Sequence, residues 1–146
     1  MFCPVLVDPE HGRTISDPES ISSLVLCTGQ VYAALRKHRE IEGIRDTAIS
    51  RIEELHPFPF TEVQRNLNLY RNTKTIVWAQ EEPYNGGAWH HVRDRIETIL
   101  RRSESHRDCR ILYAGRPQSA AVAVGIKSLH EAEQKKLRED VFSTHE

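Results

Sequence analysis

Short apolar runs alternate with amphipathic stretches along most of this chain. The runs at 23–27, 47–52, 75–79 and 111–114 are largely apolar. Runs of this length predict buried β-strands. Because strands that alternate with helices of about 10 to 15 residues build βαβ units, the pattern predicts an α/β fold. The expected architecture is a three-layer α/β/α sandwich with a mostly parallel sheet.

The amphipathic stretches between these strands predict helices. The segment 30–39 has apolar residues at helical spacing, and Thr61 is expected to be the N-cap of a second helix. The segment 88–102 has the strongest helical pattern. Its apolar residues fall on one stripe, with Arg and Glu residues on the other side: Trp89, Val92, Ile96, Ile99 and Leu100.

The remaining segments divide the chain into a lead-in at 1–22, one domain at 23–142 and a tail at 143–146. The lead-in is polar, with an extended piece expected at 4–7. Two prolines make 53–60 an irregular connection, and 101–110 is expected to be a charged surface loop. The segment 120–124 predicts either a fifth short strand or an apolar loop. A last helix is expected from Ser128, with three residues turned inward: Leu129, Ala132 and Leu137.

Composition limits the classes of function. The chain has 146 residues, 38% of them hydrophobic and 28% charged, and its formal net charge is −1. One domain with a core of normal size is expected. The balance of charge argues against a nucleic-acid or membrane partner, and no apolar run approaches the roughly 20 residues of a membrane span. Three cysteines without C-x-x-C spacing argue against a disulfide framework or a structural zinc site.

Polar residues follow each predicted strand. In an open parallel sheet, functional groups gather at the carboxyl ends of the strands. This edge is therefore the expected site, and it carries both signs of charge. The residues expected there are Thr28, Gly29, Glu53, Glu54, Gln80, Glu81, Glu82, Asn85, Gly115, Arg116 and Ser119.

Each candidate at this edge has two interpretations. Adjacent carboxylates such as Glu81 and Glu82 can have separated pKa values, but neighbours on an extended backbone point to opposite faces. A hydrogen-bonding or interface role is therefore favoured over catalysis. The turn 85–87 precedes a helix, so it is either an anion-holding turn or simply a tight turn with positive φ. Arg116 and Arg51 are candidates to grip a carboxylate or phosphate, or else they are exposed or ion-paired.

The common catalytic and cofactor motifs are absent from the sequence. It contains no H-E-x-x-H, P-loop, G-x-S-x-G or G-x-G-x-x-G motif, and no Gly-Asp-Gly. His90 and His91 are successive helix residues and do not share a face, so no metal site is expected there. The sheet is therefore predicted to have a site edge without a complete reaction centre.

Four segments together resemble the C-terminal domain of the thiamine-diphosphate-dependent decarboxylating component of 2-oxoglutarate dehydrogenase, which is a transketolase-like domain. The resemblance covers nearly the whole chain, from about Pro4 to Phe142. Gln30 stands where this family usually has Lys, and Gly86 where it usually has Gln. The matching segments are LCTGQVY at 26–32, ISRIEELHPFPF at 49–60, WAQEEPYNGGAW at 78–89 and YAGRPQSAAVAVG at 113–125.

The resemblance implies a homodimeric parent enzyme of the tricarboxylic acid cycle. That enzyme decarboxylates 2-oxoglutarate and passes the succinyl group to the lipoyl arm of the dihydrolipoyl succinyltransferase component. Thiamine diphosphate and Mg²⁺ would be bound by upstream domains. No catalytic, cofactor-binding or metal residue is therefore assigned to this chain, which is expected to be inactive alone. The expected location is the mitochondrial matrix in a eukaryote and the cytoplasm in a bacterium, and the chain itself carries no targeting segment.

Three alternatives remain open on the sequence. The chain is a module that binds an effector such as acetyl-CoA or a nucleotide, a domain of the related 2-oxoadipate dehydrogenase, or a small enzyme that uses Glu81 or Glu82. The candidates for effector or interface contacts are Arg51, Gln80, Glu81, Glu82, Asn85, Gly86, Trp89, Arg116 and Ser119.

Overall fold

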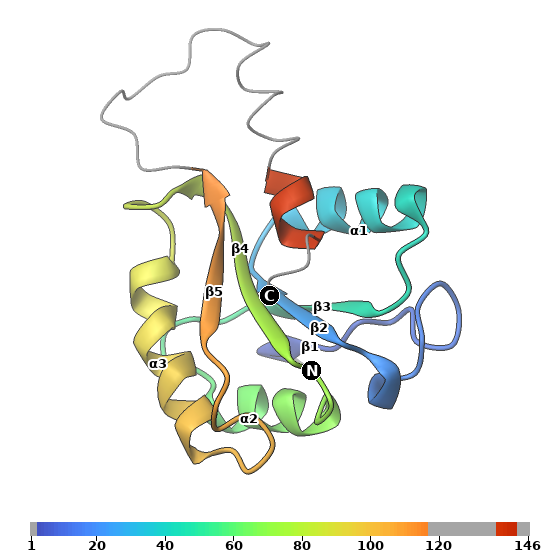
Figure 1. Ribbon diagram of the computed structural model, residues 1–146. Helices are drawn as coiled ribbons and strands as arrows, with labels where there is room; N and C mark the ends of the chain where they lie inside the picture. The colour runs from blue at the N-terminus through green and yellow to red at the C-terminus, as the bar shows by residue number, and fades with distance from the viewer. Residues whose placement is uncertain (1–2, 117–136, 143–146) are drawn as a thin grey trace, which may run out of the picture.

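The computed structural model describes residues 3–116 and 137–142, which form one five-stranded sheet with helices on both faces (Figure 1). The strand order is β1-β3-β2-β4-β5. Strands β2 to β5 are parallel to their neighbours, and β1 runs antiparallel to β3 at one edge. The strands are β1 (Val5–Leu6), β2 (Ser23–Cys27), β3 (Thr47–Ile52), β4 (Thr75–Pro83) and β5 (Ile111–Arg116).

The sequence pattern predicted the bounds of β2 and β3 correctly but ended the next two strands too early. Strand β4 continues beyond Ala79 to Pro83, and β5 continues beyond Ala114 to Arg116. The two strands stay paired through Gln80 and Gly115, with a shift in register before Pro83 meets Arg116. Backbone pairing needs no apolar side chains, so a hydrophobicity pattern does not detect where it ends.

The helices are α1 (Val31–Glu42), α2 (Phe60–Leu69) and α3 (Trp89–Arg102), with a 3₁₀ turn, η1 (Pro18–Ser20). Residues 137–142 are also helical. The expected strand or loop at 120–124 and the start of the last helix at Ser128 lie outside the described residues. None of the helices in the described part of the chain is both long and apolar enough to cross a membrane.

The prediction that Thr61 is the N-cap of the second helix is wrong. Helix α2 begins at Phe60, two residues earlier than an N-cap at Thr61 would imply, and Pro59 occupies the N-cap position. The carbonyl of Pro59 accepts a hydrogen bond of 3.0 Å from the amide of Val63. No side chain caps this end of α2. The helix therefore starts where the proline segment ends, and Thr61 lies inside it.

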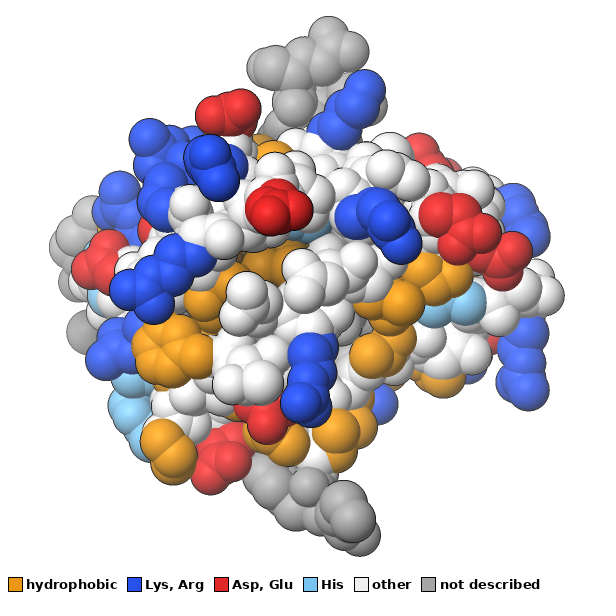
Figure 2. All heavy atoms as spheres, turned by 90° about the horizontal axis from the view of Figure 1, so that it is seen from below, with side chains coloured by type: hydrophobic (Ala, Val, Ile, Leu, Met, Phe, Trp, Pro, Cys, Tyr) orange, Lys and Arg blue, Asp and Glu red, His pale blue; other side chains and the backbone are white. Residues whose placement is uncertain are grey.

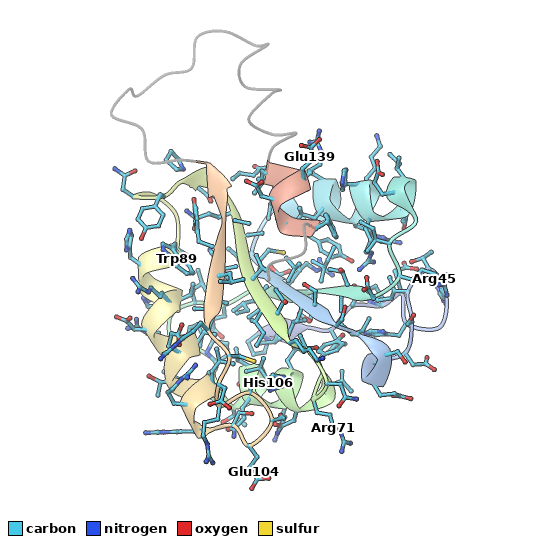
Figure 3. The ribbon with its side chains drawn as sticks, viewed as in Figure 1. Arg45, Arg71, Trp89, Glu104, His106 and Glu139 are labelled. Atoms are coloured by element: carbon cyan, nitrogen blue, oxygen red, sulfur yellow. The ribbon has the colours of Figure 1, made fainter. Side chains whose placement is uncertain are left out.

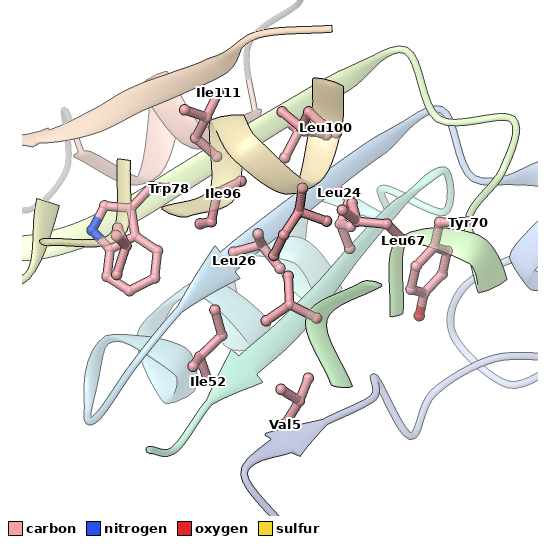
Figure 4. Close-up of a cluster of buried hydrophobic side chains, with 14 of the residues drawn as sticks. Val5, Leu24, Leu26, Ile52, Leu67, Tyr70, Trp78, Ile96, Leu100 and Ile111 are labelled. Atoms are coloured by element: carbon pink, nitrogen blue, oxygen red, sulfur yellow. The ribbon is translucent and has the colours of Figure 1, made fainter. Parts of the chain in front are cut away.

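The three layers are confirmed by two separate clusters of buried side chains. On one face of the sheet, Leu26 and Trp78 pack with residues of α2 and α3 (Figure 4). On the other face, Val25 and Val77 pack with α1 and with the helix at 137–142. Alternate residues of one apolar strand thus belong to different clusters. Burial on both faces explains why these strands are continuously apolar.

A buried ion pair joins the lead-in to the rest of the fold. Asp8 and Arg39 have side chains that are 0% and 1% exposed, and their Oδ2 and Nη1 atoms are 2.5 Å apart. The same Asp8 oxygen accepts a hydrogen bond of 2.8 Å from the amide of Ile49, and Arg39 donates one of 3.1 Å to the carbonyl of Thr47. The two side chains therefore form hydrogen bonds with backbone groups of β3 that β1 does not reach.

Breaking this pair should destabilise the fold strongly. Asp8→Asn leaves the Arg39 guanidinium charged and uncompensated in the interior, and we expect a loss of about 3 to 5 kcal/mol in the free energy of unfolding. Chemical denaturation measures it. The control is Glu40→Gln, which breaks an exposed pair with Arg36 and should change stability by less than about 0.5 kcal/mol. Equal losses in the two variants would contradict the assigned role of Asp8.

The connection after α3 differs from the surface loop expected at 101–110. Residues 101 and 102 complete α3, and His106 in the loop is fully buried. Its Nε2 lies 3.0 Å from the carbonyl oxygen of Tyr70, and its Nδ1 lies 3.3 and 3.0 Å from the hydroxyl oxygens of Ser103 and Ser105. Because a carbonyl only accepts, Nε2 carries the proton and Nδ1 accepts. The sequence pattern missed this anchor because a lone His among charged residues resembles a solvated one.

Burial lowers the pKa of His106 below its usual 6.5, although its contact with the Tyr70 carbonyl opposes the shift. The unfolded chain therefore binds a proton more readily than the folded chain. This contribution to stability is complete above pH 6.5 and is lost as the pH falls toward the lowered pKa. We expect His106→Gln to remove part of the fall in melting temperature between pH 7 and pH 5, and exposed His90→Gln to leave it unchanged. An unaltered pH profile in His106→Gln would contradict the assignment.

Candidate functional site

The buried side chain of Gln80 organises the carboxyl end of β4. It is 2% exposed, and its two polar atoms have different partners. Its Oε1 accepts hydrogen bonds from the indole Nε1 of Trp78 at 2.9 Å and from the backbone amide of Trp89 at 3.1 Å. One oxygen thus connects the strand to the first residue of α3.

The carboxamide nitrogen of Gln80 holds the segment between β4 and α3. Its Nε2 lies 3.2 Å from the carbonyl oxygen of Glu82 and 3.0 Å from those of Pro83 and Gly86. An amide nitrogen has two hydrogens, so the three carbonyls share two donors. Because Gln80 itself is buried, leaving its carboxamide without these partners would be costly. We call residues 81–88, which comprise the end of β4 and the turn that leads into α3, the Gln80 loop.

The two glycines of the Gln80 loop have a tight-turn geometry. The amide of Gly86 donates to the carbonyl of Pro83 at 2.8 Å, and Gly87 has a φ of +64°. A Cβ atom at Gly87 would lie 3.0 Å from both Oε1 of Gln80 and the side chain of Glu82. Glycine is therefore required at Gly87 on two counts. The amide of Trp89 is already bonded to Gln80, which removes one donor that an anion-holding turn would use.

Three aromatic rings pack beside the Gln80 loop on the α3 side of the sheet. The ring of Tyr113 lies edge-on to Tyr84, with centroids 5.1 Å apart, and 5.2 Å from that of Trp89. Burial raises the pKa of Tyr113, against a hydrogen bond from Gln80 that lowers it. A side chain on Gly115 would overlap the Tyr113 ring. The sequence pattern missed Tyr84 and Tyr113 as part of this site. The one available signal was the glycine at 115, directly after an apolar run, which leaves room for a bulky neighbour.

The structure places Arg51 away from the Gln80 loop. Its guanidinium carbon lies 4.1 Å above the centroid of the Tyr32 ring, and its Nη1 is 3.6 Å from a carboxylate oxygen of Glu53. Tyr32 packs with the opposite face of the sheet from Trp89. Arg51 is thus stacked and ion-paired, the second of its two interpretations.

The remaining candidates are dispersed. Glu81 is half-buried and Glu82 is exposed, both within β4, and Asn85 is exposed at the tip of the Gln80 loop. The backbone of Arg116 pairs with Pro83 at the end of β5, and Ser119 lies outside the described residues. In the described segments, no three His, Cys, Asp or Glu side chains are grouped so that they could hold a metal ion. The structure therefore brings Gln80, Gly86 and Trp89 together.

Comparison with known proteins gives one consistent picture. Residues 1–142 match the family model described as 2-oxoglutarate dehydrogenase C-terminal. The chain is 46% identical over 138 residues to the mitochondrial 2-oxoglutarate dehydrogenase of Saccharomyces cerevisiae. The aligned region covers 94% of the chain and 14% of the yeast protein. It is 44% identical over 142 residues to the 2-oxoglutarate dehydrogenase E1 component of Azotobacter vinelandii, covering 97% of the chain and 14% of that protein.

Two further similarities define the limits of this picture. The 2-oxoadipate dehydrogenase complex component E1 of Xenopus laevis is 41% identical over 128 residues, covering 86% of the chain and 13% of that protein. A solved structure described as a split gene transketolase, inactive beta4 tetramer, is 16% identical with a TM-score of 0.59, covering 96% of this chain and 41% of that one. This likeness concerns the fold. The chain spans about one seventh of the length of the curated relatives it matches.

Gln80→Leu should loosen the whole Gln80 loop. The variant removes both the acceptor of Trp78 and the donor of three carbonyls, and each buried group left unpaired costs about 1 to 3 kcal/mol. We expect a lower free energy of unfolding and faster amide hydrogen exchange throughout 81–88. Asn85→Leu, at an exposed position of the same loop, is the matched control. Unchanged exchange in Gln80→Leu would show that the carboxamide does not hold the loop.

Proposed function

Because the chain belongs to the family of 2-oxoglutarate dehydrogenase C-terminal domains, we propose that it is the C-terminal structural and interface domain of a 2-oxoglutarate dehydrogenase. The parent enzyme would decarboxylate 2-oxoglutarate and transfer the succinyl group to the lipoyl arm of a dihydrolipoyl succinyltransferase. The single observation that carries this proposal is the match to the family model over residues 1–142.

The local geometry supports a packing role for the Gln80 loop. Both polar atoms of the Gln80 side chain are hydrogen-bonded to groups of this domain. They are therefore not free to act on a reacting atom. The Gln80 loop is held in place by these bonds and exposes Asn85 at its tip. It is suited to contact a neighbouring surface, because an ordered loop loses little conformational entropy on binding. We propose that the Gln80 loop contacts the rest of the parent subunit or the second subunit of a homodimer.

Cofactor chemistry belongs to other parts of the proposed parent. Thiamine diphosphate with Mg²⁺ supplies the carbanion chemistry of decarboxylation when it is bound. The described residues do not fit the metal, since no three carboxylate, imidazole or thiolate groups are brought together. We propose that the diphosphate and Mg²⁺ are held outside this domain, and we assign no catalytic step to these residues. The proposed compartment is the mitochondrial matrix in a eukaryote or the cytoplasm in a bacterium.

We favour 2-oxoglutarate over 2-oxoadipate as the parent's substrate. Five relatives named for 2-oxoglutarate are 42% to 47% identical to this chain, whereas three named for 2-oxoadipate are 36% to 41% identical. An effector site built jointly from Arg51, Arg116 and the turn at Asn85 is the less favoured proposal. Arg51 is stacked on Tyr32 on the other face of the sheet from the aromatic rings beside the Gln80 loop.

A chimera tests the proposed function. In the yeast 2-oxoglutarate dehydrogenase, the homologous C-terminal segment would be replaced by this chain. We expect a dimeric protein that decarboxylates 2-oxoglutarate in preference to 2-oxoadipate, whereas the same enzyme without the segment should be inactive. Gln80→Leu in the chimera should reduce dimer formation, with Thr61→Leu, at an exposed position of α2, as the control. Full activity of the truncated enzyme would contradict the proposal.

The isolated chain provides a second arm of this experiment. Thiamine diphosphate with Mg²⁺ should not raise its melting temperature, because a ligand stabilises only a state that it binds. A saturable rise would contradict the placement of the cofactor site in other domains, whatever the chimera does.

A further inference from the structure

A polar hollow of about 550 Å³ lies at the amino ends of the strands, away from the Gln80 loop. It lies between the last turns of α2 and α3, next to the connection that leads into β5 (Figure 3). All of its lining side chains are polar. Two guanidinium groups (Arg71 and Arg102), two hydroxyls (Ser103 and Ser105), one carboxylate (Glu104) and two carboxamides of α2 make up the wall. Such a lining suits a hydrated, charged ligand rather than an apolar one.

The floor of the hollow is held rigidly from beneath. Ser103 lines the hollow although the residue is only 3% exposed, and its Oγ accepts a hydrogen bond of 3.3 Å from the amide of His106. The imidazole of His106 is itself anchored on the Tyr70 carbonyl at the end of α2. Burial lowers the pKa of this imidazole and so favours its neutral form, in which Nδ1 has a single lone pair facing the hydroxyls of Ser103 and Ser105. One hydroxyl donates to Nδ1, and the other keeps its hydrogen for a ligand.

Both arginines of the hollow are available to a ligand. Neither Arg71 nor Arg102 has a hydrogen bond or ion pair with another residue in the described part of the chain. Glu104 alone opposes their charge, so the wall has a net excess of positive charge. Figure 2 views the molecule from this end and shows that basic and acidic side chains are otherwise interspersed over it. Two guanidinium groups and a hydroxyl are the kinds of donor that bind an oxyanion.

We propose that this hollow binds a small molecule that carries a phosphate dianion. The two guanidinium groups bind the phosphate. The buried Ser103 donates to Nδ1 of His106, and the exposed Ser105 donates its hydroxyl hydrogen to the phosphate. A hollow of about 550 Å³ is larger than a phosphate group requires. The carboxamides of Gln64 and Asn68 therefore contact the uncharged polar remainder of the ligand. The site is independent of the function proposed above, because it lies at the other end of the sheet from the Gln80 loop.

Nuclear magnetic resonance titration of the full chain tests this site. Glucose 6-phosphate and inorganic phosphate are the probes, and glucose is the unphosphorylated control. We expect saturable shifts of the backbone amides at Arg71 and at 103–105 with both phosphates, tighter for the sugar phosphate, and none with glucose. The affinity should fall as the salt concentration rises, since exposed charges are screened.

Variants that each remove a single charge complete the test. Arg71→Gln and Arg102→Gln should each weaken binding by about tenfold, whereas Glu104→Gln should strengthen it because the opposing carboxylate is lost. Arg65→Gln, an exposed position of α2 outside the hollow, should leave the affinity unchanged. The proposal is overturned if no shift saturates, or if Arg65→Gln weakens binding as much as Arg71→Gln. It is also overturned if glucose shifts the same amides.

Discussion

Covering both faces of the sheet with helices removes water from the middle of the molecule, so each polar group left there needs a partner within the protein. Three side chains meet this constraint in different ways. Asp8, paired with Arg39, bonds the amide of Ile49 at the edge of β3, and Gln80 bonds the chain that leaves β4. His106, in the loop that follows α3, bonds the carbonyl of Tyr70, the first residue after α2. Asp8 and His106 join segments that are far apart in the chain, whereas Gln80 holds a turn close to it in the sequence.

The same constraint shapes what the carboxyl end of the sheet can do. A carboxamide has one acceptor and one donor nitrogen, and in Gln80 both are committed to the protein. Groups committed in this way determine the form of a surface but are not available for acid–base chemistry. This agrees with a domain that belongs to the 2-oxoglutarate dehydrogenase C-terminal family and spans one seventh of its relatives, where packing is the expected contribution. At the opposite end of the sheet, Arg71 and Arg102 have no hydrogen-bond or ion-pair partner among the described residues, which makes that end the better place to seek a ligand.

Much of the candidate site could be predicted from the sequence, but not how its members are used. The order of apolar runs placed Gln80 at the carboxyl edge of the sheet, and the glycines before α3 indicated the tight turn that the structure has there. The pattern gave no reason to choose Gln80 over Glu81 or Glu82, since all three are polar residues after an apolar run. Only the burial of Gln80, at 2% exposure, separates it from the two carboxylates. Tyr84 and Tyr113 were missed because they are 29 positions apart, and only β4–β5 pairing brings them together.

By itself the sequence determined the fold class, the cores of β2 to β5, the main helices and the family, because all of these depend on local periodicity or on residue identity. The tertiary structure decided where β4 and β5 end, why α2 starts at Phe60 and what lies beneath the connection after α3. It also decided which polar residues face a partner and which face water. These outcomes depend on contacts between residues distant in the chain, such as Asp8 with Arg39 and Tyr70 with His106. Their free energy comes from burial, which no stretch of sequence contains on its own.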